Sequence, residues 1–451
     1  MKKVLIITFY FPPAATAAIH RILGFSKYLP DFGWEPIILT VKKKYYDEKI
    51  LTYDTTDEVS DNLLIYKTGM IGWVRDLLKI IRYLLKAKGF TKEKQNINII
   101  KDNSKLIKNN KLKALLKLLK QLIMLPDDKI WWAPMAILKA LSINSRHRFD
   151  VIFTTGGPFS THLIGLYVSR LLNKPWIADF QDPWVSNPIM NWDFAIVKNL
   201  VMKMEKKVLT NADLIITNTK AVKEDFEKNY PYLSPDKFYT ITNGYNAENF
   251  KNVEKIDLDK FTITYTGSLY VFHSLTPFLK GIKNLLERKK DLYEKIQVLI
   301  FGSFSPVHEK EIEDIGLKKI VHLKGPKSHE EVIKYIISSH VLLVTLTTKE
   351  KRSLFIPCKI FDYLASGRQI LSISPEGELA EIIRNNAAGR VVYPDDIDGI
   401  SKAIELFYEE FMSEALHQEK KKKIEKYDAK NLTFELSKLL NTFLRKEKVL
   451  M

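Results

Sequence analysis

The hydrophobic positions in the first forty residues follow first one periodicity and then another. Residues 4–9 form a largely apolar run rich in β-branched side chains, which is typical of a strand buried on both faces. Across residues 19–29 the apolar positions recur close to helical spacing, until Pro30 and Gly33 end the pattern. A second strand-like run follows at residues 36–41. This order of strand, helix and strand predicts a βαβ unit, from which parallel sheets are built.

The same alternation continues in two series separated by a polar stretch at residues 247–260. In the first series, further strand-like runs lie at residues 150–155, 176–179, 214–218 and 238–242. In the second series they lie at residues 261–266, 296–301, 320–324, 341–346, 369–373 and 390–393. We therefore expect two doubly wound α/β domains, residues 1–246 and 247–428, whose strand carboxyl ends face a shared cleft. Residues 429–451 predict a C-terminal amphipathic helix that could pack back on the N-terminal domain.

The N-terminus allows a second interpretation. Met1, Lys2 and Lys3 followed by an apolar run resemble a short signal peptide, with the alanine-rich residues 14–18 as a cleavage region. A buried strand is favoured because the run is short, Pro12 ends it abruptly, and a helical pattern then leads into another strand. No run reaches the ~18–20 apolar residues of a membrane span. The single cysteine, Cys358, excludes an intrachain disulfide and fits a reducing compartment, so a cytoplasmic protein is expected.

The chain carries 70 Lys and Arg against 53 Asp and Glu, a net charge of +17 that should attract polyanions. Part of this excess lies in residues 70–132, which break the alternation and predict a basic helical insertion. Within it, residues 101–124 contain seven lysines and one aspartate. Aromatic residues do not interleave these lysines, so a nucleic-acid partner is not expected.

This basic segment has an apolar side. Five apolar residues follow helical spacing, and three lysines lie away from them; they are Leu112, Leu115, Leu116, Leu119 and Ile123, with Lys113, Lys117 and Lys120. One interpretation is a helix that lies on an anionic membrane surface, on the inner face of the cell membrane. The other is a helix packed on its own domain with its lysines in water.

Two segments of the second series have the residues to hold phosphate. Gly267 and Ser268 follow a strand and precede a helix, where backbone N–H groups can bind an anion, although a simple turn has the same sequence. Further on, Lys359 and Asp362 share a helical face three residues apart, and Arg352 lies just upstream. They form either a surface ion pair or a site in which the ammonium meets a diphosphate and Asp362 accepts hydrogen bonds from a ribose diol.

At this point the chain resembles the large family of retaining glycosyltransferases with the GT-B fold, family 4 of the carbohydrate-enzyme classification. The most specific match is the string around Lys359 and Asp362, which resembles the donor-binding helix of that family. Weaker matches extend the resemblance essentially end to end, at residues 9–13, 175–184, 243–245 and 266–268. The resemblance implies two Rossmann-like domains facing a central cleft, a donor site formed by Gly267, Ser268, Arg352, Lys359 and Asp362, and no cofactor or metal.

The implied activity is transfer of a hexosyl group from a nucleoside diphosphate sugar to a hydroxyl of a glycan or lipid-linked acceptor, with retention, in bacterial surface polysaccharide synthesis. The sequence departs from the family pattern at three places. Ala14 and Ala15 replace glycines of the first loop, where acceptor binding is expected, and Leu354 replaces the first of two family glutamates. Where a subgroup often has histidine, this chain has Phe159. These departures keep open a non-catalytic nucleotide-sugar or glycan binder of the same fold.

Three further residues are candidates on the acceptor side. Asp182 follows a strand, where it could bind acceptor hydroxyls or stabilise positive charge on the sugar; it could also cap nearby N–H groups. Trp184 lies beside it as an acceptor-binding candidate. His162 is the histidine nearest to the subgroup position, although a histidine inside a helix is more often structural. No residues have metal-ligand spacing, so catalysis without a metal ion is expected, with phosphate charge met by cations and helix dipoles.

Overall fold

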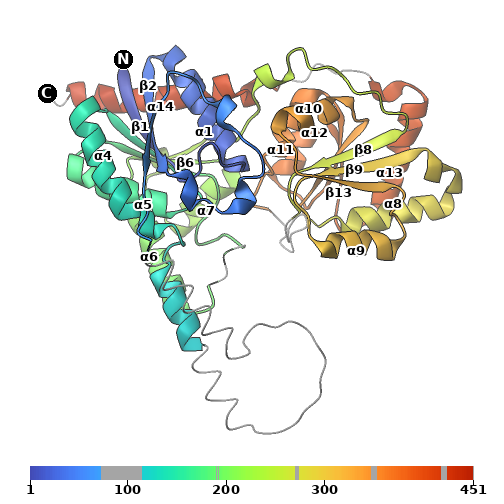
Figure 1. The fold of residues 1–451 in the computed structure, drawn as a ribbon, viewed down its shortest axis with the longest axis horizontal. Coiled ribbons are helices and arrows are strands. Elements are labelled where there is room, and N and C mark those ends of the chain that lie inside the picture. The colour runs from blue at the N-terminus through green and yellow to red at the C-terminus, as the bar shows by residue number, and fades with distance from the viewer. Residues whose placement is uncertain are drawn as a thin grey trace, which may run out of the picture.

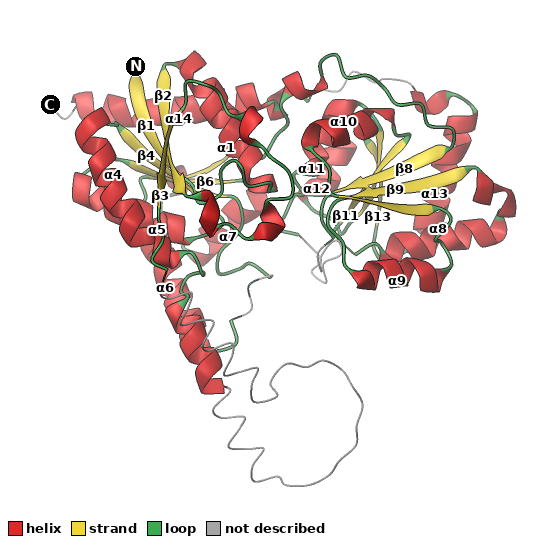
Figure 2. Ribbon diagram, in the orientation of Figure 1, coloured by secondary structure: helices red, strands yellow, loops and turns green. Residues whose placement is uncertain are grey.

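The structure, a computed structural model, describes residues 1–72, 114–188, 190, 192–269, 274–346, 353–417 and 424–449, with the backbone alone described at 417 and 444–449. Two parallel sheets organise the described chain (Figures 1 and 2). This confirms the predicted two-domain α/β architecture. We refer to the parts built on the first and second sheet as the N-terminal and C-terminal domains.

The N-terminal sheet has seven strands in the order β3-β2-β1-β4-β5-β6-β7, and all pairs are parallel. The strands are β1 (Lys2–Ile7), β2 (Trp34–Val41), β3 (Leu64–Thr68), β4 (Val151–Gly156), β5 (Trp176–Phe180), β6 (Leu214–Thr217) and β7 (Phe238–Thr240). Strand β1, which the opening apolar run predicted, lies inside the sheet between β2 and β4. The strand order reverses between β1 and β4, and crevices for ligands form at the carboxyl ends of such strands.

Helices pack on the faces of this sheet. They are α1 (Ala17–Tyr28), α4 (Ala133–His147), α5 (Ser160–Leu172), α6 (Ala195–Asn211) and α7 (Lys220–Asn229). The strands are apolar on both sides because helices cover both faces: Val4, Leu5, Ile6 and Ile7 of β1 are all fully buried.

The C-terminal sheet repeats this arrangement with six strands in the order β10-β9-β8-β11-β12-β13, again all parallel. Its strands are β8 (Phe261–Thr266), β9 (Ile296–Phe301), β10 (Val321–Gly325), β11 (Val341–Thr345), β12 (Gln369–Ile373) and β13 (Gly389–Val392). Its helices are α8 (Thr276–Arg288), α9 (Pro306–Ile315), α10 (His329–Ser338), α11 (Lys359–Ser366), α12 (Glu378–Asn385) and α13 (Ile397–Met412). Here the order reverses between β8 and β11, so the carboxyl end of β8 is the expected ligand edge.

The last helix, α14 (Ala429–Val449), returns to the N-terminal domain, where it lies in red along the blue and green half of Figure 1. Leu432, Leu436 and Leu440 join the hydrophobic core of that domain. The return is close-packed against α1, because a Cβ on Gly24 would lie 3.1 Å from the Cβ of Ala429. The C-terminal helix therefore completes the domain with which the chain begins.

Residues 114–123 form a helix that projects from the N-terminal domain (cyan in Figure 1). Leu118 and Leu122 pack against the N-terminal core, whereas Leu115 and Leu119 are 51% and 41% exposed. The helix therefore packs on its own domain, as one of the two interpretations expected, but its packed face runs through Leu118 and Leu122 rather than through Leu115 and Leu119. Leu112 and Lys113 lie outside the described residues. Among the described helices, none is both long and apolar enough to cross a bilayer.

Candidate functional site

The two domains meet where the N-terminal strands end and helices α11 and α12 begin. The backbone N–H of Lys220, the first residue of α7, donates to Glu378 Oε2 at 2.8 Å, across the domain boundary. The Thr219 hydroxyl donates to the Leu354 carbonyl at 3.1 Å. Asn243 Nδ2 lies 3.0 Å from Cys358 Sγ, one residue before α11. These contacts join the carboxyl ends of N-terminal strands to the start of α11. We refer to this domain boundary as the cleft.

Lys359 places a cation at this domain boundary. Its ammonium lies 3.6 Å from the centre of the Tyr265 ring, and a Cβ on Gly267 would come within 3.0 Å of Nζ. Burial lowers the Lys359 pKa to about 7. In the part of the chain that the structure describes, no carboxylate pairs with this ammonium. A half-buried cation without a counterion favours an anionic ligand at the Gly267 turn.

The Gly267 turn is built from backbone rather than side chains. Gly267 has a φ of 105°, which a residue with a Cβ rarely adopts. Gly302, at the end of the neighbouring strand β9, approaches so closely that a Cβ there would lie 2.4 Å from the Gly267 carbonyl carbon. Ser268, half-buried, follows the turn. The turn predicted to hold phosphate thus lies directly beneath the Lys359 ammonium.

Asp362 lies one turn further along α11, but its partner is not Lys359. Its Oδ2 is 3.0 Å from Nε2 of His329, the first residue of α10. The interpretation of Lys359 and Asp362 as a surface ion pair is therefore wrong: one side chain turns to Tyr265 and the other to His329. Sequence reasoning missed His329, whose only local signal is its place at a helix start shortly after Gly325 ends a strand.

On the N-terminal side, a buried ion pair supports the cleft floor. Arg21 of α1 donates from Nε to Asp179 Oδ2 at 3.0 Å and from Nη2 to Oδ1 at 2.7 Å, and both side chains are almost fully buried. Thr155 donates to the same carboxylate at 3.0 Å, and Gln181 donates to the Thr155 hydroxyl at 2.8 Å. The network joins α1, β4 and β5 at their cleft ends. Arg21 was not identified from the sequence, because nothing local pairs it with β5.

Asp182 lies next to this network, just after β5. Burial raises its pKa to about 6, and none of the described residues donates a hydrogen bond to its carboxylate. Burial and the nearby Asp182 charge raise the pKa of Cys358 to about 11. Because an electrostatic effect of this kind requires proximity, Asp182 lies across the cleft from the residue that precedes α11. The structure thus brings Asp182 and Lys359, from different domains, to one cleft.

His162 and Trp184 are placed differently. Neither has exposed surface. His162 Nδ1 lies 2.9 Å from the Thr154 hydroxyl, its ring lies 4.3 Å from that of Phe180, and burial lowers its pKa to about 3. Trp184 stacks on Phe159 with ring centres 4.9 Å apart. Both residues are buried in the N-terminal domain, and neither His162 Nε2 nor Trp184 Nε1 has a hydrogen-bond partner among the described residues.

The first loop is also more enclosed than the sequence suggested. Ala14 is fully buried, and its N–H donates to the Phe11 carbonyl at 3.1 Å. The Ala15 N–H donates to the Ile50 carbonyl at 2.7 Å. Both backbone donors that could have faced an acceptor are therefore used within the domain.

The structure describes part of the segment in which a family glutamate is replaced. Leu354, where that glutamate is replaced, packs against the N-terminal core, and its carbonyl accepts the Thr219 bond described above. A hydrophobic side chain thus occupies the domain boundary at this position. Arg352 lies outside the described residues.

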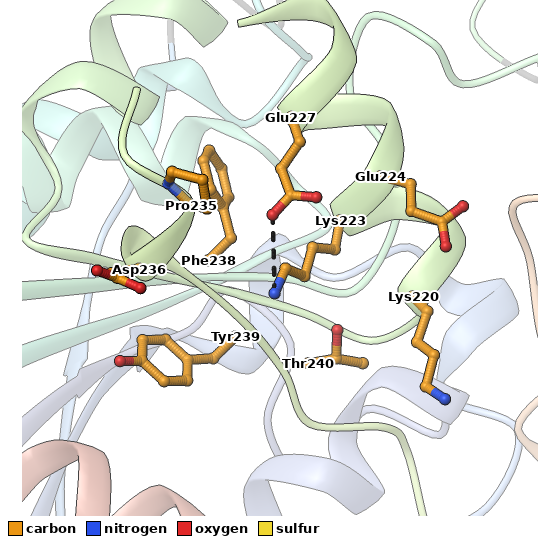
Figure 3. A pocket seen from close by; sticks show the side chains of 9 residues that line it. All are labelled: Lys220, Lys223, Glu224, Glu227, Pro235, Asp236, Phe238, Tyr239 and Thr240. Carbon is orange, nitrogen blue, oxygen red and sulfur yellow. Dashed lines mark ion pairs between the residues drawn. The ribbon is translucent and has the colours of Figure 1, made fainter. Parts of the chain in front are cut away.

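Two surface hollows lie on the N-terminal domain. One of about 550 Å³, shown in Figure 3, lies between α7 and β7 and includes the Lys223–Glu227 ion pair at 3.7 Å. A second, of about 310 Å³, lies at the base of the 114–123 helix beside Asp128 and Trp192. Neither is lined by the expected donor residues. Across the described ranges, no three His, Cys, Asp or Glu side chains are grouped to hold a metal ion.

Comparison with solved structures shows the same architecture in several enzymes. Sucrose-phosphate synthase from Thermosynechococcus elongatus superposes with a TM-score of 0.67 at 13% identity, covering 99% of this chain and 100% of that one. HepE from Anabaena, in complex with UDP-glucose, gives 0.63 at 12% identity, covering 98% and 100%. Trehalose 6-phosphate synthase from Burkholderia multivorans gives 0.63 at 11%, covering 99% and 98%. At such identities the likeness shows the GT-B fold.

Comparison with family sequence models is more specific. The model for Glycosyltransferase Family 4 matches residues 108–249, and the model for Glycosyl transferases group 1 matches residues 260–410. A comparison with curated protein sequences found no match. The two family matches adjoin the interdomain linker from either side and together span more than half of the sequence. The chain therefore belongs to the family 4, group 1 type of glycosyltransferases with the GT-B fold.

Proposed function

We propose that this glycosyltransferase binds a nucleoside diphosphate sugar in the cleft at α11 and transfers its hexosyl group to a hydroxyl, with retention. The observation that carries the proposal is the Lys359 ammonium above the Gly267 turn, with which no carboxylate of the described residues pairs. The Lys359 ammonium and the positive end of the α11 dipole stabilise a diphosphate bound there. Asp362 lies one turn further along the same helix, in reach of a ribose diol. The complex of the structural relative HepE with UDP-glucose supports a donor of this class.

In this proposal Asp182 acts from the opposite side of the cleft. A carboxylate at that position stabilises the positive charge that develops on the sugar as the bond to phosphate breaks. The proposed acceptor is a glycan or a lipid-linked glycan in bacterial surface polysaccharide synthesis. Because Lys359 and the helix dipole meet the phosphate charge, transfer is expected to continue in the presence of EDTA. Loss of activity with EDTA that Mg²⁺ or Mn²⁺ restores would contradict this.

The donor assignment is tested by binding and turnover together. UDP-, GDP-, ADP- and dTDP-linked hexoses are first screened for thermal stabilisation, since a ligand of the folded state raises apparent stability. For the donor that binds, calorimetric titration of Lys359→Ala should show a loss of about 1.5–3 kcal/mol, the size of a charge-assisted hydrogen bond. Unchanged affinity in both Lys359→Ala and Asp362→Ala would remove the site assignment.

A second candidate function is non-catalytic binding of a nucleotide sugar or glycan. Two observations favour it: Leu354 supplies no carboxylate to a donor sugar, and the Ala14 and Ala15 N–H groups donate to carbonyls of the N-terminal domain. The two functions predict the same donor affinity but differ in turnover. Donor hydrolysis or transfer by wild type that Asp182→Asn abolishes would support the enzyme, whereas binding without any turnover would support the binder.

We further propose that the 114–123 helix attaches the protein to an anionic membrane surface, near a lipid-linked acceptor. Leu115 and Leu119 are exposed on this projecting helix, with Lys120 nearby. Lys117 is engaged at 2.7 Å by Asp193, so part of the predicted free charge is paired. Each lysine near such a surface contributes about 1 kcal/mol, screened over roughly 8 Å in physiological salt. Attachment should therefore be reversible and weaken with salt.

Co-sedimentation with phosphatidylglycerol and phosphatidylcholine vesicles tests the attachment. Binding to the anionic vesicles alone is expected, and Leu115→Ser with Leu119→Ser should weaken it. Leu138→Ser is the matched control, because Leu138 is 63% exposed on α4, outside the projecting helix. Equal binding by all three proteins, or no binding at low salt, would contradict the proposal.

A further inference from the structure

His329 occupies a junction between α10, α11 and the interdomain linker. Its Nε2 lies 3.0 Å from Asp362 Oδ2, and its Nδ1 lies 3.3 Å from the amide nitrogen of Asn249. The side chains of His329 and Asp362 are 19% and 20% exposed. An amide that donates to Nδ1 leaves the proton on Nε2, which points to Asp362. The Asn249 amide therefore holds the imidazole at Nδ1, and the Nε2 N–H of the imidazole donates to Asp362.

Asp362 depends on this one donor. Among the described residues, His329 alone donates to its carboxylate, and it uses only Oδ2. Without that bond the carboxylate would rotate between staggered positions, and ordering it would have to accompany ligand binding. With the bond in place, Oδ1 is held in one orientation and keeps its accepting capacity. The arrangement is that of a preorganised acceptor for a hydroxyl donor.

The N-terminal domain contacts the same imidazole. His20 of α1 packs its ring on His329 with centres 4.8 Å apart, and Glu58 Oε2 lies 3.7 Å from His20 Nδ1. Burial and the neighbouring His329 lower the pKa of His20 to about 4, so His20 is neutral near pH 7. Burial opposes charge on His329, but the Asp362 carboxylate and Glu58 together raise the His329 pKa. His20 thus offers a neutral ring on which His329 packs across the domain boundary.

We propose that His329 is the positioning residue of the donor site: it orients the Asp362 carboxylate toward the ribose diol, and His20 of the opposite domain holds it there. This rests on the proposed donor function. His329 itself is not required to touch the donor. Domain closure and donor binding are linked, because His329, which holds Asp362, packs on His20 of the other domain.

The test compares His329→Ala with His329→Gln in the full chain. UDP, GDP, ADP and dTDP are titrated into wild type, and the nucleotide that binds is used throughout. His329→Ala should weaken binding about tenfold, as expected for loss of a hydrogen bond to a charged group. His329→Gln should bind within about threefold of wild type, because its amide N–H can still donate to Asp362. His20→Ala should give a smaller loss than His329→Ala.

Two further measurements separate positioning from a structural role. In turnover with the matching nucleotide sugar, His329→Ala should raise the donor KM and leave kcat within about twofold, the pattern of lost uniform binding. In the Asp362→Ala background, His329→Ala should cause no further loss, since the two residues act through one bond. His308→Ala is the matched control: it also lies near a helix start of the C-terminal domain, but it contacts Ser305. Its donor affinity should equal that of wild type.

The outcomes are distinct. If wild type binds no nucleotide and no nucleotide sugar, the proposed donor function fails and this inference fails with it. If wild type binds, Asp362→Ala does not, and His329→Ala binds as wild type does, only this inference is overturned. Equal losses in His329→Ala and His329→Gln would assign His329 a structural role and also overturn it. Should His329→Ala not fold, the Gln variant and the His20→Ala variant decide the matter by the same titration.

Discussion

Lys359 and Asp362 are three residues apart on α11, yet their side chains serve different neighbours. Lys359 extends over Tyr265 and the Gly267 turn, and Asp362 reaches His329. Because the two charges do not neutralise each other, each stays available to a ligand that presents an anion and a diol side by side. A nucleoside diphosphate has this combination.

The first prediction at the residue scale concerns pH. Burial lowers the Lys359 pKa to about 7, and the ammonium is the form that binds an anion. As pH rises above 7, the free protein loses this charge, so donor affinity should fall by up to about tenfold per unit. The fall in donor affinity ends at the pKa of Lys359 in the complex, which the bound phosphate raises. Titration at pH 6, 7, 8 and 9 measures it. Lys359→Arg, which stays charged, should remove the slope; an identical slope in that variant would contradict the assignment.

The second residue-scale prediction concerns the buried pair beneath the cleft. Arg21→Ala leaves the Asp179 carboxylate in a buried site without its bidentate partner, which typically costs about 3–5 kcal/mol. Urea unfolding measures the change. Lys430→Ala, which removes an exposed partner of Asp31, is the control and should unfold as wild type does. A similar result for both variants would show that the buried network does not stabilise the domain.

At the scale of elements, Glu205 joins α6 to the loop after β5 and to the end of α7. Its carboxylate accepts from the Tyr230 hydroxyl at 2.6 Å and from the Val185 N–H at 2.8 Å. No cation approaches it among the described residues, and burial raises its pKa to about 7. The loop that carries Asp182 is therefore anchored by a carboxyl group whose ionisation is costly.

This arrangement predicts a pH-dependent stability. The folded-state pKa of about 7 exceeds the usual value of 4.5, so the unfolded chain ionises first. Wild-type stability should therefore fall as pH rises from about 4.5 to 7 and then level off. Glu205→Gln lacks this titration, so its stability relative to wild type should improve between pH 5 and pH 8. Urea unfolding at the two pH values decides it, and a constant difference would contradict the role of Glu205.

At the scale of the whole molecule, the chain passes between the domains twice, and the two passages lie side by side. The Tyr245 N–H donates to the Tyr427 carbonyl at 3.0 Å, and the Ala429 N–H donates to the Tyr245 carbonyl at 2.8 Å. Gly244 permits this approach, since a Cβ there would lie 2.1 Å from the Tyr427 oxygen. The second passage delivers α14 to the N-terminal core.

The prediction at this scale is that α14 stabilises the N-terminal domain, although it follows the C-terminal one. Leu436→Ala and Leu440→Ala should each cost about 2–5 kcal/mol, because both side chains are fully buried in that core. Phe434→Ala is the control on the same helix, since Phe434 is 43% exposed. Urea unfolding followed by tryptophan fluorescence reports the effect. Equal stability of Leu440→Ala and Phe434→Ala would show that α14 contributes little.

The sequence by itself determined the two parallel sheets and the helix that carries Lys359 and Asp362. Those features depend on local periodicity: apolar runs bounded by Pro and Gly define strands, and i, i+3 spacing places two side chains on one helical face. Strand β1 and the turn at Gly267 follow from the same local patterns.

Only the tertiary structure decided which side chains meet. His329 and Asp362 are 33 positions apart, Arg21 and Asp179 are 158 apart, and no periodicity relates such pairs. Burial also depends on tertiary packing: His162 lies in the core, although its sequence position made it a candidate for the cleft. Local sequence sets the conformation of each element, whereas partners and burial depend on how elements distant in the chain pack together. That packing brought His329 to Asp362, turned Leu115 and Leu119 outward, and left Lys359 without a counterion among the residues that the structure describes.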